Sequence, residues 1–148
     1  MARSDIHRSL FSHWVPVRSH WRDMDGLRHI NHAAFLTYME TARLDFYHEL
    51  GFDYHRWDLE TSTILVGMKV NYRKQASHPT EFEVGTRLTR IGRTSFDLLT
   101  AVFPTGEESP VVDALFTLVT YNFSRQEKVP VPETFQAKLQ PLDTQTLV

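Results

Sequence analysis

The sequence predicts an α+β domain in which one long helix is wrapped by a five-stranded antiparallel sheet. The chain reads as one alternating segment, one long helical segment and then four consecutive segments of strand character. Short links between the last four segments favour antiparallel neighbours in one sheet. A single helix packed on such a sheet is an α+β layout.

The helical segment has clear signals at both ends. Asn31 suits an N-cap and Gly51 suits the position just past a C-terminus. The roughly twenty residues between them would make a helix about 30 Å long. Its apolar positions cover more than half of the circumference, so we expect a mostly buried helix. They are Phe35, Met39, Ala42, Phe46 and Leu50, widened by Ala34, Leu36, Tyr38, Leu44 and Tyr47.

The strand signals differ in kind. Residues 14–22 alternate between two faces, and Pro16 within them predicts an edge strand because proline cannot donate to a ladder. Residues 63–73 are apolar on both faces, which suggests burial on both sides, and Gly67 suggests a bulge. A connection over 52–62 precedes this strand. The remaining strands are expected at 81–91, 94–103 and 111–123.

Composition narrows the class of protein. The chain has 148 residues, 41% of them hydrophobic, with net charge −2 and no cysteine. We therefore expect a single domain over 1–148, with 1–12 and 136–148 as peripheral tails, and no disulfide framework, nucleic-acid partner or cofactor. No signal peptide or membrane span is apparent, so a cytoplasmic location is expected.

Two carboxylates and two imidazoles gather just before the helix, at Asp23, Asp25, His29 and His32. A helix N-terminus exposes unpaired N–H groups that can hold a carbonyl oxygen, and a carboxylate beside it could activate water. Other interpretations stay open. Asp23 could cap a turn or pair with an arginine, and Asp25 could close an Asx turn. The spacing fits no familiar metal motif.

This stretch resembles the D-x-D-x-x-G-H-V-N-N segment of hot-dog thioesterases of the 4-hydroxybenzoyl-CoA thioesterase type. The matching residues are Asp23, Asp25, Arg28, His29, Ile30, Asn31 and His32, followed by Phe35, Leu36, Tyr38, Met39, Glu40, Ala42 and Arg43. Weaker similarity covers Val70, Tyr72, Arg73 and the run Gly92-Arg93-Thr94-Ser95-Phe96. The resemblance implies a hot-dog fold and hydrolysis of acyl-CoA thioesters at a site shared between two subunits.

The resemblance also implies roles for individual residues. Asp25 corresponds to the catalytic carboxylate, as general base or nucleophile, and the carbonyl-polarising N–H falls at His32, with His29 beside them. Substrate contacts are expected from Asn31, Arg93 and Arg73, with the two arginines as candidates for the CoA phosphates. Some members place a carboxylate on the helix, where this chain has Glu40, although pairing with Arg43 explains that residue more simply. A homodimer or homotetramer is implied.

The motif is not reproduced in full. Arg28 occupies the place of the usual glycine and would be strained if the loop requires positive φ there. His32 replaces the final asparagine, and Leu27 stands where plant acyl-carrier-protein thioesterases carry an asparagine, so their mechanism does not transfer. These departures keep a second function open, a non-catalytic hot-dog module that binds acyl-CoA or a protein partner.

Overall fold

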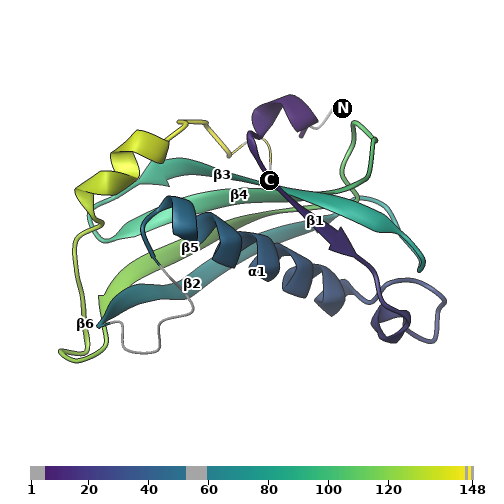
Figure 1. The fold of residues 1–148 in the computed structure, drawn as a ribbon, viewed down its shortest axis with the longest axis horizontal. Helices are drawn as coiled ribbons and strands as arrows, with labels where there is room; N and C mark the ends of the chain where they lie inside the picture. Colours follow the sequence, from purple (N-terminus) through teal and green to yellow (C-terminus); the bar gives the residue numbers. More distant parts are fainter. Residues whose placement is uncertain (1–5, 53–59, 146, 148) are drawn as a thin grey trace.

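One long helix packs against one face of a curled antiparallel sheet, as the sequence predicted for a hot-dog fold (Figure 1). The computed structural model describes residues 6–52, 60–145 and 147. The strand order is β1-β3-β4-β5-β2, and a two-residue β6 pairs with β5. The elements are η1 (Arg8–Leu10), β1 (His13–Arg18), η2 (Trp21–Asp23), α1 (His32–Glu49), β2 (Thr61–Tyr72), β3 (Glu81–Ile91), β4 (Ser95–Pro104), β5 (Val112–Asn122), β6 (Glu127–Lys128) and η3 (Glu133–Lys138). Most of the predicted connection over 52–62 lies outside the described residues.

Helix α1 begins and ends where its capping residues predicted. The side chain of Asn31 accepts a hydrogen bond from the N–H of Ala33 at 2.8 Å, and Gly51 has φ of +89°. The prediction of a mostly buried helix was wrong, because the sheet covers α1 from one side only. Residues such as Thr37, Glu40 and Asp45 on the opposite side are exposed.

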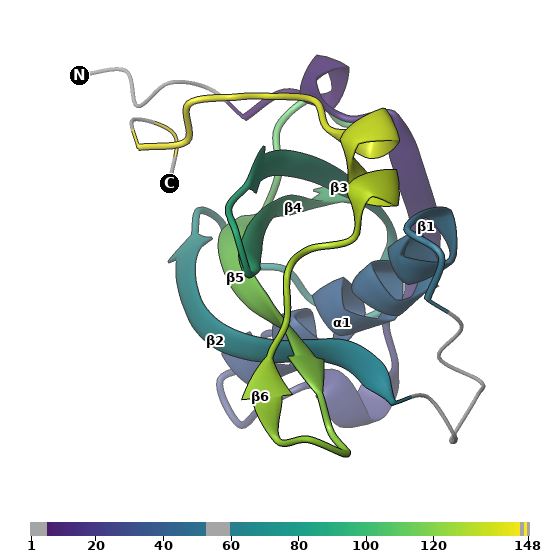
Figure 2. The same cartoon turned by 90° about the vertical axis from the view of Figure 1, so that its left-hand side faces the viewer.

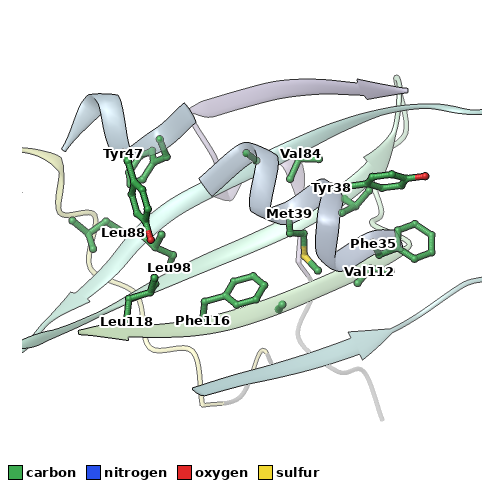
Figure 3. Close-up of a cluster of buried hydrophobic side chains, with 14 of the residues drawn as sticks. Phe35, Tyr38, Met39, Tyr47, Val84, Leu88, Leu98, Val112, Phe116 and Leu118 are labelled. Atoms are coloured by element: carbon green, nitrogen blue, oxygen red, sulfur yellow. The ribbon is translucent and has the colours of Figure 1, made fainter. Parts of the chain in front are cut away.

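The core fills the space between α1 and the central strands, as Figure 3 shows. Met39 from the helix is fully buried, as are Val84, Leu98 and Val112 from three neighbouring strands. Two aromatic contacts, Phe35 and Tyr38 against Phe82, fix the N-terminal half of the helix on β3. The end of α1 that follows Asp25 is therefore packed directly on the sheet. None of the described helices is long and apolar enough to cross a membrane.

Strand β1 is an edge strand, as Pro16 predicted, but it is shorter than the predicted 14–22. The chain leaves the sheet after Arg18, because the N–H of His20 turns to the carboxylate of Asp23 at 2.8 Å and closes η2. The alternating pattern of residues 19–22 therefore belongs to a helical turn.

Strand β2 forms the opposite edge of the sheet and is not buried on both faces within the chain, which corrects the prediction for 63–73. Leu65, Val66, Met68 and Tyr72 are exposed. The predicted bulge is present, since the register with β5 shifts between Leu65 and Gly67. The continuous apolar run therefore belongs to an edge strand whose apolar side chains are exposed in the single chain.

The register of β2 shows which way these exposed side chains face. Leu65 lies opposite Leu118, and Met68 lies opposite Phe116. Directly opposite residues share a face of the sheet, and Leu118 and Phe116 belong to the core under α1. The apolar side chains of β2 therefore continue the inner face of the sheet beyond the cover of the helix.

The segments before β1 and after η3 pack against the outer face of the sheet and along β3 (Figure 2). Ile6 and Phe11 are buried beside Leu99 and Phe103. Phe135 in η3, just before the predicted tail over 136–148, is fully buried between Phe52 and Phe96. Because polar residues flank these apolar side chains, the sequence pattern did not predict their burial.

We expect Phe135→Ala to lower the free energy of unfolding by about 3–5 kcal/mol, because it removes a fully buried ring and leaves a cavity. Phe123→Ala is the matched control, since that ring is 47% exposed and its loss should change stability little. Urea denaturation followed by circular dichroism measures both, and equal effects would show that η3 is not part of the cooperative core.

Candidate active site

The Asp25 loop, defined as residues 24–31, joins η2 to α1 and is fixed to the body of the protein at both ends. Met24 and Ile30 form an antiparallel bridge across its base. The N–H of Ile30 donates to the carbonyl of Ala76 at 2.7 Å, and the hydroxyl of Ser77 donates to the carbonyl of Arg28 at 2.9 Å. The segment before β3 thus holds the loop in one conformation, as a catalytic loop requires.

Asp23 has a positioning role. Its carboxylate accepts hydrogen bonds from the N–H of His20 at 2.8 Å and from the hydroxyl of Tyr38 at 2.5 Å. Its carbonyl accepts from the N–H of Asn31 at 2.8 Å. Burial, together with the hydrogen bond to Asp23 and its charge, raises the pKa of Tyr38 well above the usual range, so this phenol stays a donor. The capping alternative for Asp23 is confirmed, with Tyr38 as its side-chain partner.

Asp25 combines an Asx turn with an available carboxylate oxygen. Its Oδ1 accepts from the N–H of Leu27 at 2.8 Å and lies 3.5 Å from the N–H of His29. Its backbone N–H donates to the carbonyl of His29 at 2.9 Å. Oδ2 makes no hydrogen bond within the described part of the chain, and the residue is only half-buried. The turn therefore orients the carboxylate and leaves one oxygen for a water or a substrate.

Arg28 takes the backbone conformation that the motif's glycine would supply. Its φ is +66°, in the left-handed region that disfavours residues with a Cβ. The loop thus keeps its shape despite the substitution, at the cost of local strain. The expected consequence of this departure from the motif is confirmed.

His32 is the first residue of α1, and Asn31 is its N-cap. The N–H of His32 has no hydrogen-bond partner among the residues that the structure describes, as expected for the first turn of a helix. The hydroxyl of Tyr72 donates to the carbonyl of His32 at 3.0 Å and ties the end of β2 to this site.

The ring of His29 is half-buried and makes no hydrogen bond to a described residue. The side chain of Asn31 caps the helix. A contact between Asn31 and the substrate stays a prediction.

The structure gives Arg73 a role inside the fold. Its guanidinium pairs with Asp113 through Nε and Nη2, and Nη2 also donates to the carbonyl of Leu147 at 3.0 Å. Asp113 is fully buried, so Arg73 balances a carboxylate in the sheet. A contact between Arg73 and a CoA phosphate stays a prediction.

Arg93 lies in the turn between β3 and β4 and is exposed. The Asp25 loop contacts the segment just before Glu81, at the other end of β3. The eleven residues of β3 separate these two ends by about 35 Å. Within one chain, Arg93 and Asp25 therefore cannot bind the same small ligand group.

A cavity of about 350 Å³ lies between α1 and β2, on the inner face of the sheet. Its lining residues are Glu40, Arg43, Leu44, Tyr47, Phe52, Ser62, Thr63, Leu65 and Leu118. The predicted pairing of Glu40 with Arg43 is confirmed as a loose ion pair, with Oε2 and Nη2 3.8 Å apart. No group of three or more His, Asp or Glu side chains within the described ranges is placed to hold a metal ion.

Sequence reasoning missed Tyr38, Tyr72 and Arg43 as residues of this region. Tyr38 was assigned to the apolar stripe of the helix, Arg43 to a pair with Glu40, and Tyr72 to the predicted strand over 63–73. A polar tip at a core position of a helix was the available signal for Tyr38 and Arg43. The contact of Tyr72 with His32 joins positions forty residues apart, so only the fold reveals it.

Solved structures with the same fold include several thioesterases, all below 25% sequence identity to this chain. The PA5185 protein from Pseudomonas aeruginosa has a TM-score of 0.81 and 22% identity, over 90% of this chain and 92% of its own. The BH1999 gentisyl-coenzyme A thioesterase has a TM-score of 0.75 and 17% identity, over 86% and 99%. The DHNA-CoA thioesterase from Staphylococcus aureus has a TM-score of 0.71 and 21% identity, over 84% and 83%.

Among curated proteins, none matches this sequence. A family model does match, over residues 19–139, and its description is the thioesterase-like superfamily. This match does not single out the 4-hydroxybenzoyl-CoA thioesterase type that the motif suggested. Because the matched residues include the Asp25 loop, the helix and strands β2 to β5, the chain belongs to the thioesterase-like superfamily.

Proposed function

We propose that this protein hydrolyses acyl-CoA thioesters to the free acid and CoA. One observation carries the proposal: Oδ2 of Asp25 has no partner among the described residues, and its loop leads into the first residue of α1, His32, whose N–H is also unpaired there. A carboxylate and a backbone donor for the carbonyl oxygen are the two parts that thioester hydrolysis needs.

In the proposed reaction, the thioester oxygen accepts a hydrogen bond from the N–H of His32 at the positive end of the helix dipole. Asp25 takes a proton from water as the water oxygen bonds to the carbonyl carbon. The carbon–sulfur bond then breaks, and the thiolate of CoA receives the proton. Direct attack by Asp25, followed by hydrolysis of the anhydride, is the alternative route.

The inner face of β2 offers a place for the acyl group. Leu65 and Met68 are exposed on the side of the sheet that faces α1. Tyr72 links one end of β2 to His32, and the hydroxyl of Thr63 contacts the hydroxyl of Tyr47 at 2.8 Å near the other end. An apolar acyl chain that starts at His32 could therefore follow β2 alongside the helix.

A homodimer would complete this site. Strand β2 has a free edge with exposed apolar side chains, which favours pairing with another strand. A two-fold axis at this edge would pair β2 with its copy in antiparallel fashion. The turn with Arg93 lies at the Thr61 end of β2, because Thr120, opposite Thr63, contacts Thr94. Antiparallel pairing would thus bring Arg93 of one subunit toward the Asp25 loop of the other.

We expect the protein to form at least a dimer at micromolar concentration and Val66→Glu to give a monomer. A charge placed on the free edge of each copy would oppose its burial between the two strands. Trp21→Glu is the control, because this exposed side chain follows β1 at the opposite edge. Light scattering after gel filtration measures the mass, and a monomeric wild-type protein would contradict the proposed assembly.

We expect Asp25→Asn to lower kcat by at least about 10²-fold with KM and folding little changed, because asparagine cannot take a proton. Asp23→Asn is the comparison. It should lower the melting temperature by weakening the bond to Tyr38 and should reduce kcat much less. Thiol release from a panel of acyl-CoAs measures activity. Binding of acyl-CoA without thiol release by the wild-type protein would favour the non-catalytic alternative.

We expect Arg93→Ala to raise KM for acyl-CoA and to leave pantetheine thioesters, which lack the CoA phosphates, nearly unaffected. Mixed dimers test whether the site is shared. A dimer of one Asp25→Asn subunit and one Arg93→Ala subunit would hold one fully intact site only if each site takes Asp25 and Arg93 from different chains. Absence of any low-KM activity in the isolated mixed dimer would mean that each site takes both residues from one chain and would contradict the shared site. An unchanged KM of the Arg93→Ala homodimer would place Arg93 outside the site.

A further inference from the structure

The guanidinium of Arg43 is a buried positive charge with unused donors. Arg43 is 8% exposed, and its Cζ lies 4.8 Å above the ring of Phe116. Its Nη1 is buried and has no hydrogen-bond partner within the described ranges. Glu40 is the facing acid, but 3.8 Å is beyond hydrogen-bond length and the Glu40 side chain is 61% exposed. An unpaired buried donor is costly, which points to a ligand or water at this position.

The α1–β2 cavity around Arg43 has both polar and apolar walls, with Glu40, Ser62 and Thr63 among its polar lining residues. Leu44, Phe52 and Leu118 line it beside the guanidinium. Tyr47 adds a hydroxyl, whose pKa is raised by burial while the Thr63 hydroxyl and the Arg43 charge oppose this effect. Arg43 and Tyr47 are thus donors in a site whose apolar walls can hold part of a hydrocarbon chain.

The cavity lies away from the reacting end of the helix. Arg43 follows His32 by eleven residues, a rise of about 16 Å along α1. The exposed apolar side chains of β2 lie between the two positions, since Tyr72 is next to His32 and Thr63 is next to Tyr47. A group bound at Arg43 would therefore belong to the far end of a long acyl chain.

Building on the thioester hydrolysis proposed above, we infer that the preferred acyl group is a long chain whose far end carries a hydrogen-bond-accepting oxygen, received by Arg43. A terminal hydroxyl or a terminal carboxylate would both supply this oxygen. The terminal hydroxyl is the better fit, because Glu40 already balances the charge of Arg43 loosely. A plain alkyl chain would fill the cavity and leave Nη1 unpaired.

Binding of thioether analogues of acyl-CoA, which cannot be hydrolysed, tests this inference separately from catalysis. The ligands are dodecyl-CoA and its ω-hydroxy and ω-carboxy forms, measured by isothermal titration calorimetry. We expect wild-type protein to bind the ω-hydroxy form about tenfold or more tightly than dodecyl-CoA. We expect Arg43→Met, which keeps the length of the side chain, to remove this preference. Arg125→Met is the control, since Arg125 is an exposed arginine paired with Glu127.

Two results would overturn the inference while leaving the proposed hydrolysis intact. One is equal affinity of wild-type protein for the oxygenated and plain analogues. The other is a preference that Arg43→Met retains. If Arg43→Met does not fold by circular dichroism, Arg43→Lys replaces it, because lysine keeps the charge but has no counterpart of Nη1. A change in dimer mass with unchanged ligand preference would instead assign Arg43 to contact with a second copy.

Glu40→Gln separates the two oxygenated ligands. Removing the Glu40 carboxylate should strengthen binding of the ω-carboxy analogue by about tenfold and change binding of the ω-hydroxy analogue little. An unchanged affinity for the ω-carboxy form would show that its carboxylate does not reach Arg43 and would count against the inference.

Discussion

A single helix is too narrow to cover a five-stranded sheet, and this mismatch governs the architecture of the protein. With side chains a helix is about 10–12 Å wide, whereas five strands at about 4.8 Å spacing are about twice that width. The sheet curls around α1, yet β2 at one edge stays uncovered. The open inner face of β2, the cavity beside Arg43 and the free strand edge all follow from this one geometric constraint.

The Asp25 loop shows how two nearby carboxylates come to differ in role. Asp23 uses its carboxylate and its carbonyl for hydrogen bonds to His20, Tyr38 and Asn31. Asp25 uses only Oδ1 for the turn. The carboxylate of Asp23 therefore fixes the loop on the helix. The carboxylate of Asp25 is held in place through Oδ1, and its Oδ2 has no partner among the described residues. Such a division is typical of sites in which positioning residues restrain a reactive group.

The terminal segments cover apolar side chains on the outer face of the sheet. Leu99, Ala101 and Phe103 would be exposed there without Ile6 and Phe11. The C-terminal segment follows β3, where the N–H of Gln140 donates to the carbonyl of Leu88 at 2.9 Å. The chain thus covers its outer face with its own termini and leaves the edge at β2 open.

The sequence alone determined the elements, because helix caps and strand periodicity are local properties. Asn31, Gly51, Pro16 and Gly67 each predicted a boundary, an edge or a bulge that the structure contains. The D-x-D motif also located the candidate catalytic loop. The strained φ of Arg28 was anticipated from the same motif.

Only the tertiary structure decided what depends on neighbours distant in sequence. An apolar run looks the same at the centre of a sheet and at an uncovered edge, so the exposure of β2 could not be read from its residues. The sequence offered Arg73 as a contact for the CoA phosphates, and only the fold shows that it pairs with Asp113. Arg43 looked like half of a surface pair, and only the position of Phe116 and β2 around it shows that its charge is buried.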